Sequence, residues 1–414
     1  MIPGKSICIP ASPTVDVSAF LPIVEHPLFQ RLRERKQLGV NYLVFPGAVH
    51  SRFEHAVGTL ALTQRLCRVH EIRGERMRTL CAFALLHDIG HGPFSHQIEP
   101  ILEGHHHQIG LQCLNEMESA VRSCEVDPDE LKAMLSEEHP DAPFVSDRNL
   151  GTDKLDYLTR DALHIGFAGV PDVQILQFYT DFNHETLAIE EKFIEDIKRL
   201  QKFYSYLHQH GYLNKTALTA QRLLQRAVQE EMAADELEPS AFWRMTDCEL
   251  TAWLRKGRTP IGRDLGKRLA ERRLHRSFLV FKPDGYGFVE RRNDKSLAVC
   301  EWSLKQLRHF SDRHATCQAM GTLENALDDL LGLEHGTILL AAMPYFRKLL
   351  PQDVRVFARD SGEGFLLFEK DRAHYRSLES DYLRTFAVRL TAPVELREQL
   401  ALEAPRIERF LETV

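Results

Sequence analysis

The chain has 414 residues, of which 43% are hydrophobic and 27% are charged. This balance excludes an intrinsically disordered protein, and the length exceeds the roughly 250–300 residues at which a single hydrophobic core stops growing. The net charge of −7 argues against a surface that is generally coated with nucleic acid, but it leaves room for a small basic pocket that binds a phosphorylated metabolite.

The cysteines and the apolar segments indicate the compartment. Eight cysteines are scattered without a CxxC pair, which favours free thiols over a disulfide framework and gives no support for a zinc knuckle. The N-terminus lacks the features of a signal peptide, and no apolar run approaches the about 18 residues that a membrane span needs. We therefore expect a soluble, cytoplasmic protein without a membrane partner.

Helical patterns dominate the first two thirds of the chain. Leu80–Leu86 is apolar throughout and predicts a buried helix that ends before Gly90, Gly92 and Pro93. An extended piece is predicted at 40–45. The other predicted helices cover residues 28–37, 52–69, 109–121, 153–164, 190–210, 216–234 and 248–255.

Strand patterns follow in the last third. Short strands are predicted at 277–281, 287–290, 297–300, 338–342, 354–357, 364–368 and 386–390, with a closing helix at 393–412. Asp360-Ser361-Gly362 predicts a hairpin turn. Because helices come first and mixed strands later, we expect a mainly α protein with an all-helical core in residues 1–274 and a smaller α+β lobe in residues 275–414.

The pair His87-Asp88 at the end of the buried helix is the most informative feature. An aspartate there opposes the helix dipole at a cost of roughly 0.3–1 kcal/mol, and when buried it needs a partner cation. A lone His-Asp pair means little, because most such pairs lie on the surface. Together with His55 and Asp153 from two other predicted helices, however, it gives two imidazoles and two carboxylates. Such a set can hold Zn²⁺, Fe²⁺, Mn²⁺, Co²⁺ or Ni²⁺ in an open site.

Groups suited to phosphate chemistry flank these candidate ligands. A metal-polarised water is what hydrolysis of a phosphoester needs. Arg52 and Lys154 stand next to candidate ligands and provide cations for phosphate oxygens. A departing alkoxide needs a proton donor, and the candidates are His91, His96 or His106, with Glu99 as the carboxylate that holds and polarises the imidazole.

Several motifs carry a resemblance to a known family. The order His…His-Asp…Asp is the signature of the HD-domain metal-dependent phosphohydrolases. The surrounding residues closely resemble the deoxynucleoside triphosphate triphosphohydrolases, a similarity that extends over about residues 20–275. The motifs are Gln37-Leu38-Gly39, 44–48, 52–55, 87–96 and 153–161, with weaker ones at 206–212, 245–250 and 268–273.

This resemblance implies hydrolysis of a deoxynucleoside triphosphate (dNTP) at the α-phosphorus, with a deoxynucleoside and inorganic triphosphate as products. It implies His91 and His106 at the α-phosphate, partnered by Glu99, and His96 as the proton donor to the leaving 5′-oxygen. Tyr157 and Asp161 would lie at the sugar 3′-hydroxyl, and Tyr212 would exclude a ribose 2′-hydroxyl. The implied metal ligands are His55, His87, Asp88 and Asp153, and the implied substrate-binding residues are Gln37, Leu38, Arg52, Lys154, Tyr157, Asp161, His208 and Tyr212.

Three positions depart from the pattern of the family. Glu99 stands where the animal enzyme has aspartate, and His107 replaces a glutamate after the equivalent of His106. Tyr204 occupies the position of an arginine that would contact the terminal phosphate, and Arg199 or Lys202 could replace it. Without such a cation, a monophosphate or another nucleotide becomes a plausible substrate.

Other interpretations stay open at this point. The metal could be Mn, Fe, Zn, Co, Ni or Mg, with or without a second Mg²⁺ bound with the substrate phosphates. The chain could be an HD-domain phosphohydrolase or phosphodiesterase for another nucleotide, a di-iron oxygenase, or a slow nucleotide-binding regulator. By analogy with relatives we expect a homo-oligomer, with contacts through the C-terminal lobe.

Overall fold

The computed structural model describes residues 4–102, 104–183, 186–234, 238–291, 295–359 and 363–413. Two compact units divide the chain, and each has its own hydrophobic core. The first unit comprises residues 1–207, 239–247 and 351–375. The second comprises residues 208–238, 248–350 and 376–414.

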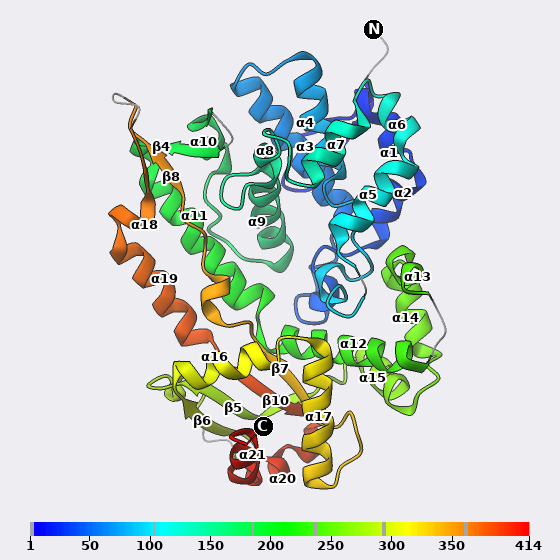
Figure 1. Cartoon of the computed structure of the whole chain (residues 1–414), viewed down its shortest axis with the longest axis vertical. Coiled ribbons are helices and arrows are strands. Elements are labelled where there is room, and N and C mark those ends of the chain that lie inside the picture. The colour runs from blue at the N-terminus through cyan, green and yellow to red at the C-terminus, as the bar shows by residue number, and fades with distance from the viewer. Residues whose placement is uncertain are drawn as a thin grey trace. The chain divides into compact units, whose positions relative to one another are not determined.

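Helices make up most of the first unit, and three of them position the candidate site. They are α3 (Arg52–Val69), α4 (Gly74–Leu86) and α9 (Thr152–Ile165), and α3 lies between the other two (Figure 1). The other helices are α1 (Leu21–Val24), α2 (Pro27–Gln30), α5 (His106–Glu116), α6 (Glu118–Arg122), α7 (Pro128–Leu135), α8 (Pro143–Ser146), α10 (Val173–Phe178), α11 (Ile194–Leu207), α13 (Pro239–Arg244) and α18 (Leu367–Lys370).

Local signals explain where these three helices begin and end. The hydroxyl of Ser51 accepts the backbone N–H of Glu54 and caps the start of α3. α4 buries every residue from Thr79 to Leu86, as the apolar run predicts. α9 ends at Gly166, whose positive φ of 78° suits the left-handed C-cap position.

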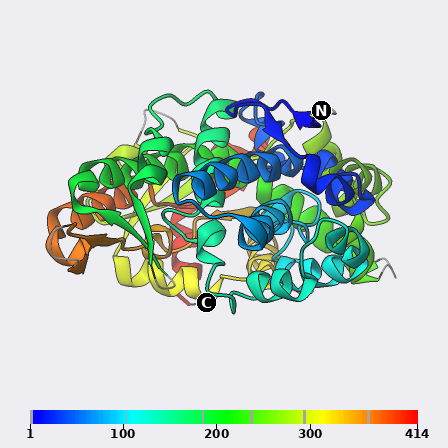
Figure 2. The same cartoon turned by 90° about the horizontal axis from the view of Figure 1, so that it is seen from above.

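The first unit also contains two small sheets. Strands β1 (Ser6–Ile7) and β2 (Val15–Asp16) pair antiparallel close to the N-terminus, which Figure 2 marks. Strand β2 contacts α3, where Gln64 Nε2 donates to the Asp16 carbonyl at 2.8 Å. The other sheet has the order β3-β4-β8-β9 and is antiparallel except between β4 and β8. Its strands are β3 (Thr180–Asn183), β4 (Thr186–Glu190), β8 (Arg355–Phe357) and β9 (Gly364–Leu366).

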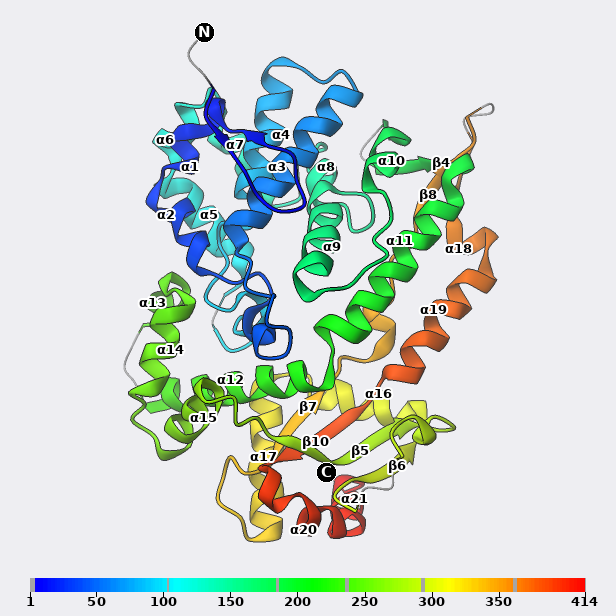
Figure 3. The same ribbon diagram turned by 180° about the vertical axis from the view of Figure 1, so that it is seen from behind.

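The second unit places helices around a sheet of order β6-β5-β10-β7 (Figure 3). Its strands β5 (Arg276–Pro283) and β6 (Ala298–Trp302) are parallel, whereas β10 (Val388–Ala392) is antiparallel to β5 and to β7 (Leu339–Ala342). The helices are α12 (Lys215–Ala234), α14 (Asp247–Arg255), α15 (Pro260–Ala270), α16 (Leu304–Arg313), α17 (Cys317–Leu331), α19 (Arg372–Thr385), α20 (Arg397–Leu402) and α21 (Ala404–Leu411), of which α14 and α19 begin in residues of the first unit.

A buried charge network joins two helices of the second unit. Arg222 on α12 donates two hydrogen bonds of 2.7 Å to the carboxylate of Glu324 on α17. Arg226 donates to the same carboxylate, which also accepts the backbone N–H of Leu340 on β7 at 2.8 Å. Arg222, Arg226 and Glu324 are at most 3% exposed, so the network ties α12, α17 and the sheet together inside the core.

The mainly helical fold with a C-terminal α+β portion confirms the predicted class, but several local predictions were wrong. Residues 39–43 form a 3₁₀-helix in place of the extended piece, because i→i+3 hydrogen bonds such as Asn41 N–H to the Leu38 carbonyl close there. Residues 287–289 form another in place of a strand. The closing helix is split into α20 and α21, and strands β3 and β4 were not predicted.

Two predictions about the organisation of the chain are not decided by this architecture. The hairpin turn at Asp360-Ser361-Gly362 lies outside the described residues, although β8 and β9 on either side of it pair antiparallel. A domain boundary between residues 274 and 275 stays a prediction, since the compact units describe packing and not which segment folds alone. Among the described residues, no helix has both the length and the apolar character of a membrane span.

Candidate metal centre

The four predicted metal ligands converge in the first unit. His55 projects from α3, His87 and Asp88 follow the last residue of α4, and Asp153 lies in the first turn of α9. Asp153 Oδ1 is 3.0 Å from His55 Nε2 and 3.5 Å from His87 Nε2. Asp88 Oδ2 is 3.6 Å and 3.5 Å from the same two nitrogens. The donor atoms of His55, His87 and Asp153 lie within 4.8 Å of one another, and Asp88 borders this group through its contacts with the two imidazoles.

Hydrogen bonds hold both imidazoles with the Nε2 atom toward this centre. His55 Nδ1 donates to Asp156 Oδ2 at 2.8 Å, and His87 Nδ1 donates to the Ala84 carbonyl at 2.9 Å. Each Nε2 is buried without a hydrogen-bond partner. A nitrogen fixed in this way, with its lone pair unused, is the usual form of a metal-binding histidine. The residues thus fit a divalent cation.

The carboxylates around His55 supply negative charge for such a cation. Burial lowers the pKa of His55, but the close contacts and negative charges of Asp153 and Asp156 outweigh it and raise the pKa to about 10. The site therefore attracts positive charge strongly, and a metal ion would use the Nε2 lone pair that otherwise takes the proton.

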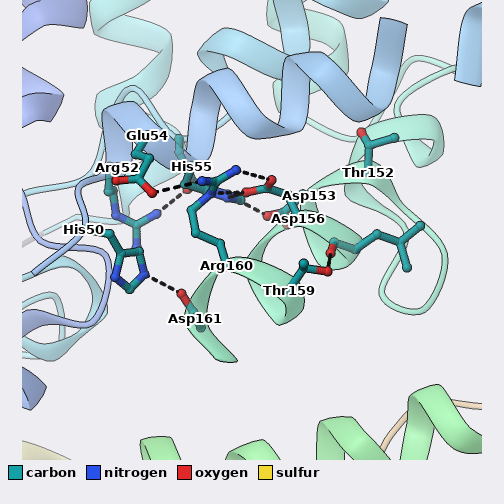
Figure 4. A network of polar contacts seen from close by, with 12 residues as sticks. His50, Arg52, Glu54, His55, Thr152, Asp153, Asp156, Thr159, Arg160 and Asp161 are labelled. Atoms are coloured by element: carbon teal, nitrogen blue, oxygen red, sulfur yellow. Dashed lines mark hydrogen bonds and ion pairs between the residues drawn. The ribbon is translucent and has the colours of Figure 1, made fainter. Parts of the chain in front are cut away.

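A buried network of hydrogen bonds and ion pairs holds His55 through its Nδ1 atom (Figure 4). Arg160 on α9 donates to both oxygens of Asp156, at 2.9 Å and 2.8 Å, and to Glu54 Oε1 at 3.0 Å. Because Asp156 accepts from Arg160 and from His55 at once, its carboxylate is held in place and fixes the orientation of the imidazole.

Asp88 is paired with Arg52. The Arg52 guanidinium donates to Asp88 Oδ2, and its Nε donates to the hydroxyl of Ser95 at 2.7 Å. Burial raises the pKa of Asp88, but the charges of Arg52 and His87 outweigh it and hold the pKa well below its usual range. The carboxylate of Asp88 at the end of α4 is thus ionised, and Arg52 is the partner cation that a buried aspartate needs.

A second group of histidines lies beside Asp88. Glu99 accepts from His96 Nδ1 at 3.0 Å and from His106 Nδ1 at 2.7 Å. The His91 and His106 rings stack with centroids 4.0 Å apart, and His91 Nε2 is 3.3 Å from Asp88 Oδ1. Burial and the charge of Arg52 lower the pKa of His91 well below 6.5, so this imidazole is neutral. The three histidines and Glu99 therefore form one connected group.

The loop that carries His91 and His96 is held in an uncommon backbone conformation. Phe94 and Ser95 have positive φ values of 53° and 56°, which cost energy for residues with a side chain. Asp247 accepts the backbone N–H groups of Phe94 at 2.7 Å and of Lys36 at 2.9 Å, and so fixes this turn from a distant part of the sequence. Gly90 has no Cβ, which lets the loop lie directly against the His106 carbonyl and Gly110 on α5.

A cavity of about 730 Å³ opens onto both groups of side chains. This volume is within the range of about 300–1,000 Å³ that small-molecule sites occupy. The wall includes His87, Asp88, Asp153, His96, His106 and Arg148. A ligand in this cavity can therefore touch the candidate metal ligands and the second histidine group together.

Other predicted substrate-binding residues of the first unit already contact neighbouring side chains. Lys154 Nζ is 3.3 Å from the centre of the Tyr204 ring and 5.1 Å from that of Tyr157, and burial lowers the pKa of Lys154 to about 7. Asp161 Oδ1 accepts a hydrogen bond from His50 Nε2 at 2.7 Å. Gln37 Oε1 is buried without a hydrogen-bond partner, and the half-buried Leu38 follows it.

Two predicted residues belong to the second unit. His208 and Tyr212 lie on one turn of π-helix, His208–Tyr212, with ring centroids 4.9 Å apart. Single π-helical turns are frequent at functional sites. Their part in substrate binding stays a prediction. His107, the departure next to His106, is half-buried and lines the cavity as well.

The sequence analysis missed residues that support the site. Asp156 and Arg160 stand in the same motif as Asp153, and Asp156 is three residues along the helix, so their shared face was a usable signal. Asp247 and Arg148 gave no comparable signal. The hydrogen bond between Asp247 and Phe94 spans 153 residues, and Arg148 stands between the predicted helices at 109–121 and 153–164, where no motif was identified.

Comparisons with known families match two segments of the chain. The model of the HD domain matches residues 52–160, which include all four candidate metal ligands. The model described as HD associated region matches residues 206–298. The four candidate metal ligands therefore lie within the segment that matches the HD domain.

Similar proteins agree with this assignment. An uncharacterised protein of Methanocaldococcus jannaschii is 31% identical over 267 residues, 63% of this chain and 56% of the relative. The deoxynucleoside triphosphate triphosphohydrolase SAMHD1 homolog of Dictyostelium discoideum is 28% identical over 257 residues, 55% of this chain and 50% of the relative. The chain thus spans about half the length of these relatives.

Solved structures share the fold over nearly the whole chain. The crystal structure of a phosphohydrolase from Bacteroides thetaiotaomicron matches with a TM-score of 0.71 and 22% identity, over 94% of this chain and all of that chain. A hypothetical protein from Aquifex aeolicus matches with a TM-score of 0.69 and 19% identity, over 97% and 99% of the two chains. At this identity, the likeness shows the fold alone.

Proposed function

We propose that this chain, an HD-domain protein related to the deoxynucleoside triphosphate triphosphohydrolases, is a metal-dependent phosphohydrolase that cleaves dNTPs at the α-phosphorus. The products would be a deoxynucleoside and inorganic triphosphate. One observation carries the proposal: two buried Nε2 atoms without hydrogen-bond partners face Asp88 and Asp153, beside a histidine–glutamate group and a cavity of about 730 Å³.

His55, His87, Asp88 and Asp153 would hold the metal in this proposal. A divalent cation bound there would neutralise charge at the phosphorus and lower the pKa of a water molecule. Asp156 and Arg160 keep His55 in position, while Arg52 keeps Asp88 ionised and oriented. The metal could be Mn, Fe, Zn, Co, Ni or Mg, because imidazole and carboxylate ligands suit each of them.

The second histidine group would handle the leaving oxygen. His96 Nδ1 is held by Glu99, so its Nε2 is left to donate a proton to the 5′-oxygen. His91 and His106 would contact the α-phosphate. Glu99 serves both His96 and His106, and hydrogen bonds from both overcome its burial and lower the pKa of its carboxyl, which keeps it ionised. The longer side chain of glutamate can therefore do what aspartate does in the animal enzyme.

Residues outside the metal set would select the nucleotide. The unpartnered Oε1 of Gln37 is suited to accept a bond from a sugar hydroxyl, and Tyr157 and Asp161 would lie at the 3′-hydroxyl, with Leu38 against the base. Lys154 and Arg52 do not line the cavity, so they would add positive potential near the phosphates and not direct contacts. The resemblance also implies substrate-binding roles for His208 and Tyr212 of the second unit, where Tyr212 would exclude ribonucleotides.

Product analysis tests the reaction. Purified protein with Mn²⁺, Co²⁺ or Mg²⁺ is incubated with each dNTP, NTP and dNMP, and the products are separated by chromatography. We expect inorganic triphosphate from at least one dNTP. Release of orthophosphate or pyrophosphate alone would contradict cleavage at the α-phosphorus and favour a phosphohydrolase for another nucleotide.

A second candidate function follows from the other histidine group. His91, His96, Glu99 and His106 have donor atoms within 4.8 Å of one another and could hold a second metal ion, as a di-iron oxygenase would require. Glu99 accepts hydrogen bonds from two Nδ1 atoms, and these bonds occupy the carboxylate that a second metal ion would need as a ligand. Two irons per chain together with oxygen consumption would reverse that preference.

Two further expectations about the protein in its setting remain proposals. We expect a homo-oligomer in the cytoplasm, with a nucleotide as its partner and without a stable complex with nucleic acid. Light scattering on the purified protein measures the oligomeric state, and a monomer at all concentrations would contradict the first expectation.

A further inference from the structure

The cavity beside the metal centre is short of positive charge for a triphosphate. Its wall contains the carboxylates of Asp88, Asp153 and Glu137. Among the described residues that line it, Arg148 is the only arginine or lysine. A substrate with several phosphates needs cations along its phosphate chain, because each buried negative charge must be paired. One or more side chains near the cavity must therefore supply these cations.

The two cations predicted from the sequence do not line this cavity and already have partners. Arg52 is 2% exposed and donates to Asp88 and Ser95. Lys154 is 8% exposed, and its Nζ lies over the ring of Tyr204. Tyr204, at the position where the family has an arginine, gives no charge of its own.

Arg148 differs from both in exposure and in partners. It lies between α8 and α9 and is exposed, and no described side chain or carbonyl forms a hydrogen bond or an ion pair with its guanidinium. The planar guanidinium can donate two parallel hydrogen bonds to phosphate oxygens, which an ammonium group cannot do. Arg148 is thus a free cation on the wall of the candidate site.

The backbone on both sides of Arg148 is fixed in advance. Asp147 Oδ1 accepts the N–H groups of Asn149 at 2.9 Å and of Leu150 at 2.7 Å. Asn149 Nδ2 donates to the Asp353 carbonyl at 3.0 Å. A Cβ on Gly151 would collide with the backbone of Val145 and Asp147, so only glycine lets the loop close. Little conformational entropy of the backbone remains to be lost when Arg148 binds an anion.

We propose that Arg148 binds the phosphate chain of the substrate and replaces the arginine that is missing at Tyr204. This inference rests on the proposed function, since it takes a nucleotide polyphosphate as the ligand of the cavity. Arg148 is a specificity residue: it favours substrates with a phosphate chain over monophosphates. It also removes the need for Arg199 or Lys202, which lie on α11 and do not line the cavity.

Steady-state kinetics of Arg148→Ala with the preferred dNTP test the proposal. We expect KM to rise by about tenfold or more while kcat changes less, because one charge-assisted bidentate contact is lost. Arg148→Lys should recover part of the loss. Arg199→Ala and Lys202→Ala are the matched controls, and their KM should equal that of the wild type.

Binding of inorganic triphosphate to the metal-loaded protein separates this proposal from the proposed function. Calorimetry should show weaker triphosphate binding by Arg148→Ala than by the wild type, whether or not a dNTP is hydrolysed. Hydrolysis without any change of KM or of triphosphate affinity in Arg148→Ala would overturn the role of Arg148, and so would a rise of KM in Arg199→Ala or Lys202→Ala instead. A wild type that binds triphosphate through Arg148 but hydrolyses no dNTP would overturn the reaction alone.

Discussion

Two buried networks of ion pairs in this protein contain similar residue types but differ in the atoms at which they end. In the first unit, Glu54, Arg160 and Asp156 form a chain of ion pairs that leads to His55. In the second unit, Arg222, Arg226 and Glu324 join α12 to α17, and Glu324 also accepts a backbone N–H from β7. The first network ends in an Nε2 atom without a partner, whereas every oxygen of Glu324 is used.

This difference separates a site from a structural link. Burial of charge is costly in both networks, and ion pairs offset that cost in both. In the first unit the atom without a partner is an imidazole nitrogen with a lone pair, which can coordinate a cation. In the second unit the atom without a partner is Arg226 Nε, whose N–H cannot coordinate one. A free lone pair beside carboxylates therefore indicates a candidate site, and a buried ion pair alone does not.

The largest effect is expected from removal of a metal ligand. Asp88→Ala should lower dNTP hydrolysis to the background of the assay and lower the bound metal, since a carboxylate of the site is lost. Asp88→Asn, which keeps the size of the side chain beside Arg52, should behave in the same way. Metal analysis and circular dichroism measure occupancy and folding, and activity within tenfold of the wild type would refute the proposed metal set.

The structural network should respond in stability and not in chemistry. Glu324→Ala leaves Arg222 and Arg226 buried without their carboxylate, which should lower the free energy of unfolding by about 3–5 kcal/mol. Urea titration of the second unit's unfolding measures this loss. At temperatures where the variant is folded, kcat per folded molecule should be unchanged, and a fall in kcat would show that the link also serves the site.

The support of His55 should have an intermediate effect. Asp156→Asn keeps the shape but removes the charge that orients the imidazole, so metal affinity should fall by roughly 10–100-fold. Added metal should restore the rate, which distinguishes a positioning residue from a ligand. Asp196→Asn on α11 serves as a matched control. A variant with wild-type metal affinity would show that the charge of Asp156 is not needed to orient His55.

The smallest effect concerns a buried histidine outside any such centre. His275 is 1% exposed, neither ring nitrogen has a hydrogen-bond partner, and no group of metal-binding residues in the described part of the chain includes it. Burial lowers its pKa to about 3, so the folded state stays neutral where the unfolded chain takes a proton. Stability should therefore fall as the pH drops below about 6.5.

The pH dependence of unfolding checks this expectation. Between pH 7 and pH 5, His275 should account for about 1–2 kcal/mol of the lost free energy of unfolding. Chemical denaturation of His275→Leu at the two pH values should show a correspondingly shallower loss. An equal loss in both proteins would mean that His275 is not kept neutral by the fold.

The sequence predicted the metal centre better than its surroundings. His55, His87, Asp88 and Asp153 could be found because each stands at a helix end or on a helical face that apolar residues define. The residues that support the site could not all be found. The hydrogen bond from the Phe94 N–H to Asp247, for example, depends on how segments far apart in the sequence pack. Arg148 escaped notice because a lone exposed arginine in a loop has no pattern of its own.

In the fold, too, the elements that depend on local sequence were predicted, and those that depend on contacts with distant segments were missed. Helices α3, α4 and α9 follow from local sequence patterns, and their bounds lie within a few residues of the predicted ones, apart from the polar first turns of α4. The strands β3 and β4 were missed, because a pair of short strands gains its stability from β8, which lies far along the chain. Local patterns could not reveal such pairing.

The anchoring of the Phe94–Ser95 turn by Asp247 has a consequence for biosynthesis. The candidate metal ligands and the second histidine group are all translated before residue 165, yet the turn that carries His91 and His96 is held by a side chain that is made much later. A nascent chain on the ribosome therefore contains these side chains before it can arrange them, and under the proposed function its activity would wait until residue 247 has left the exit tunnel.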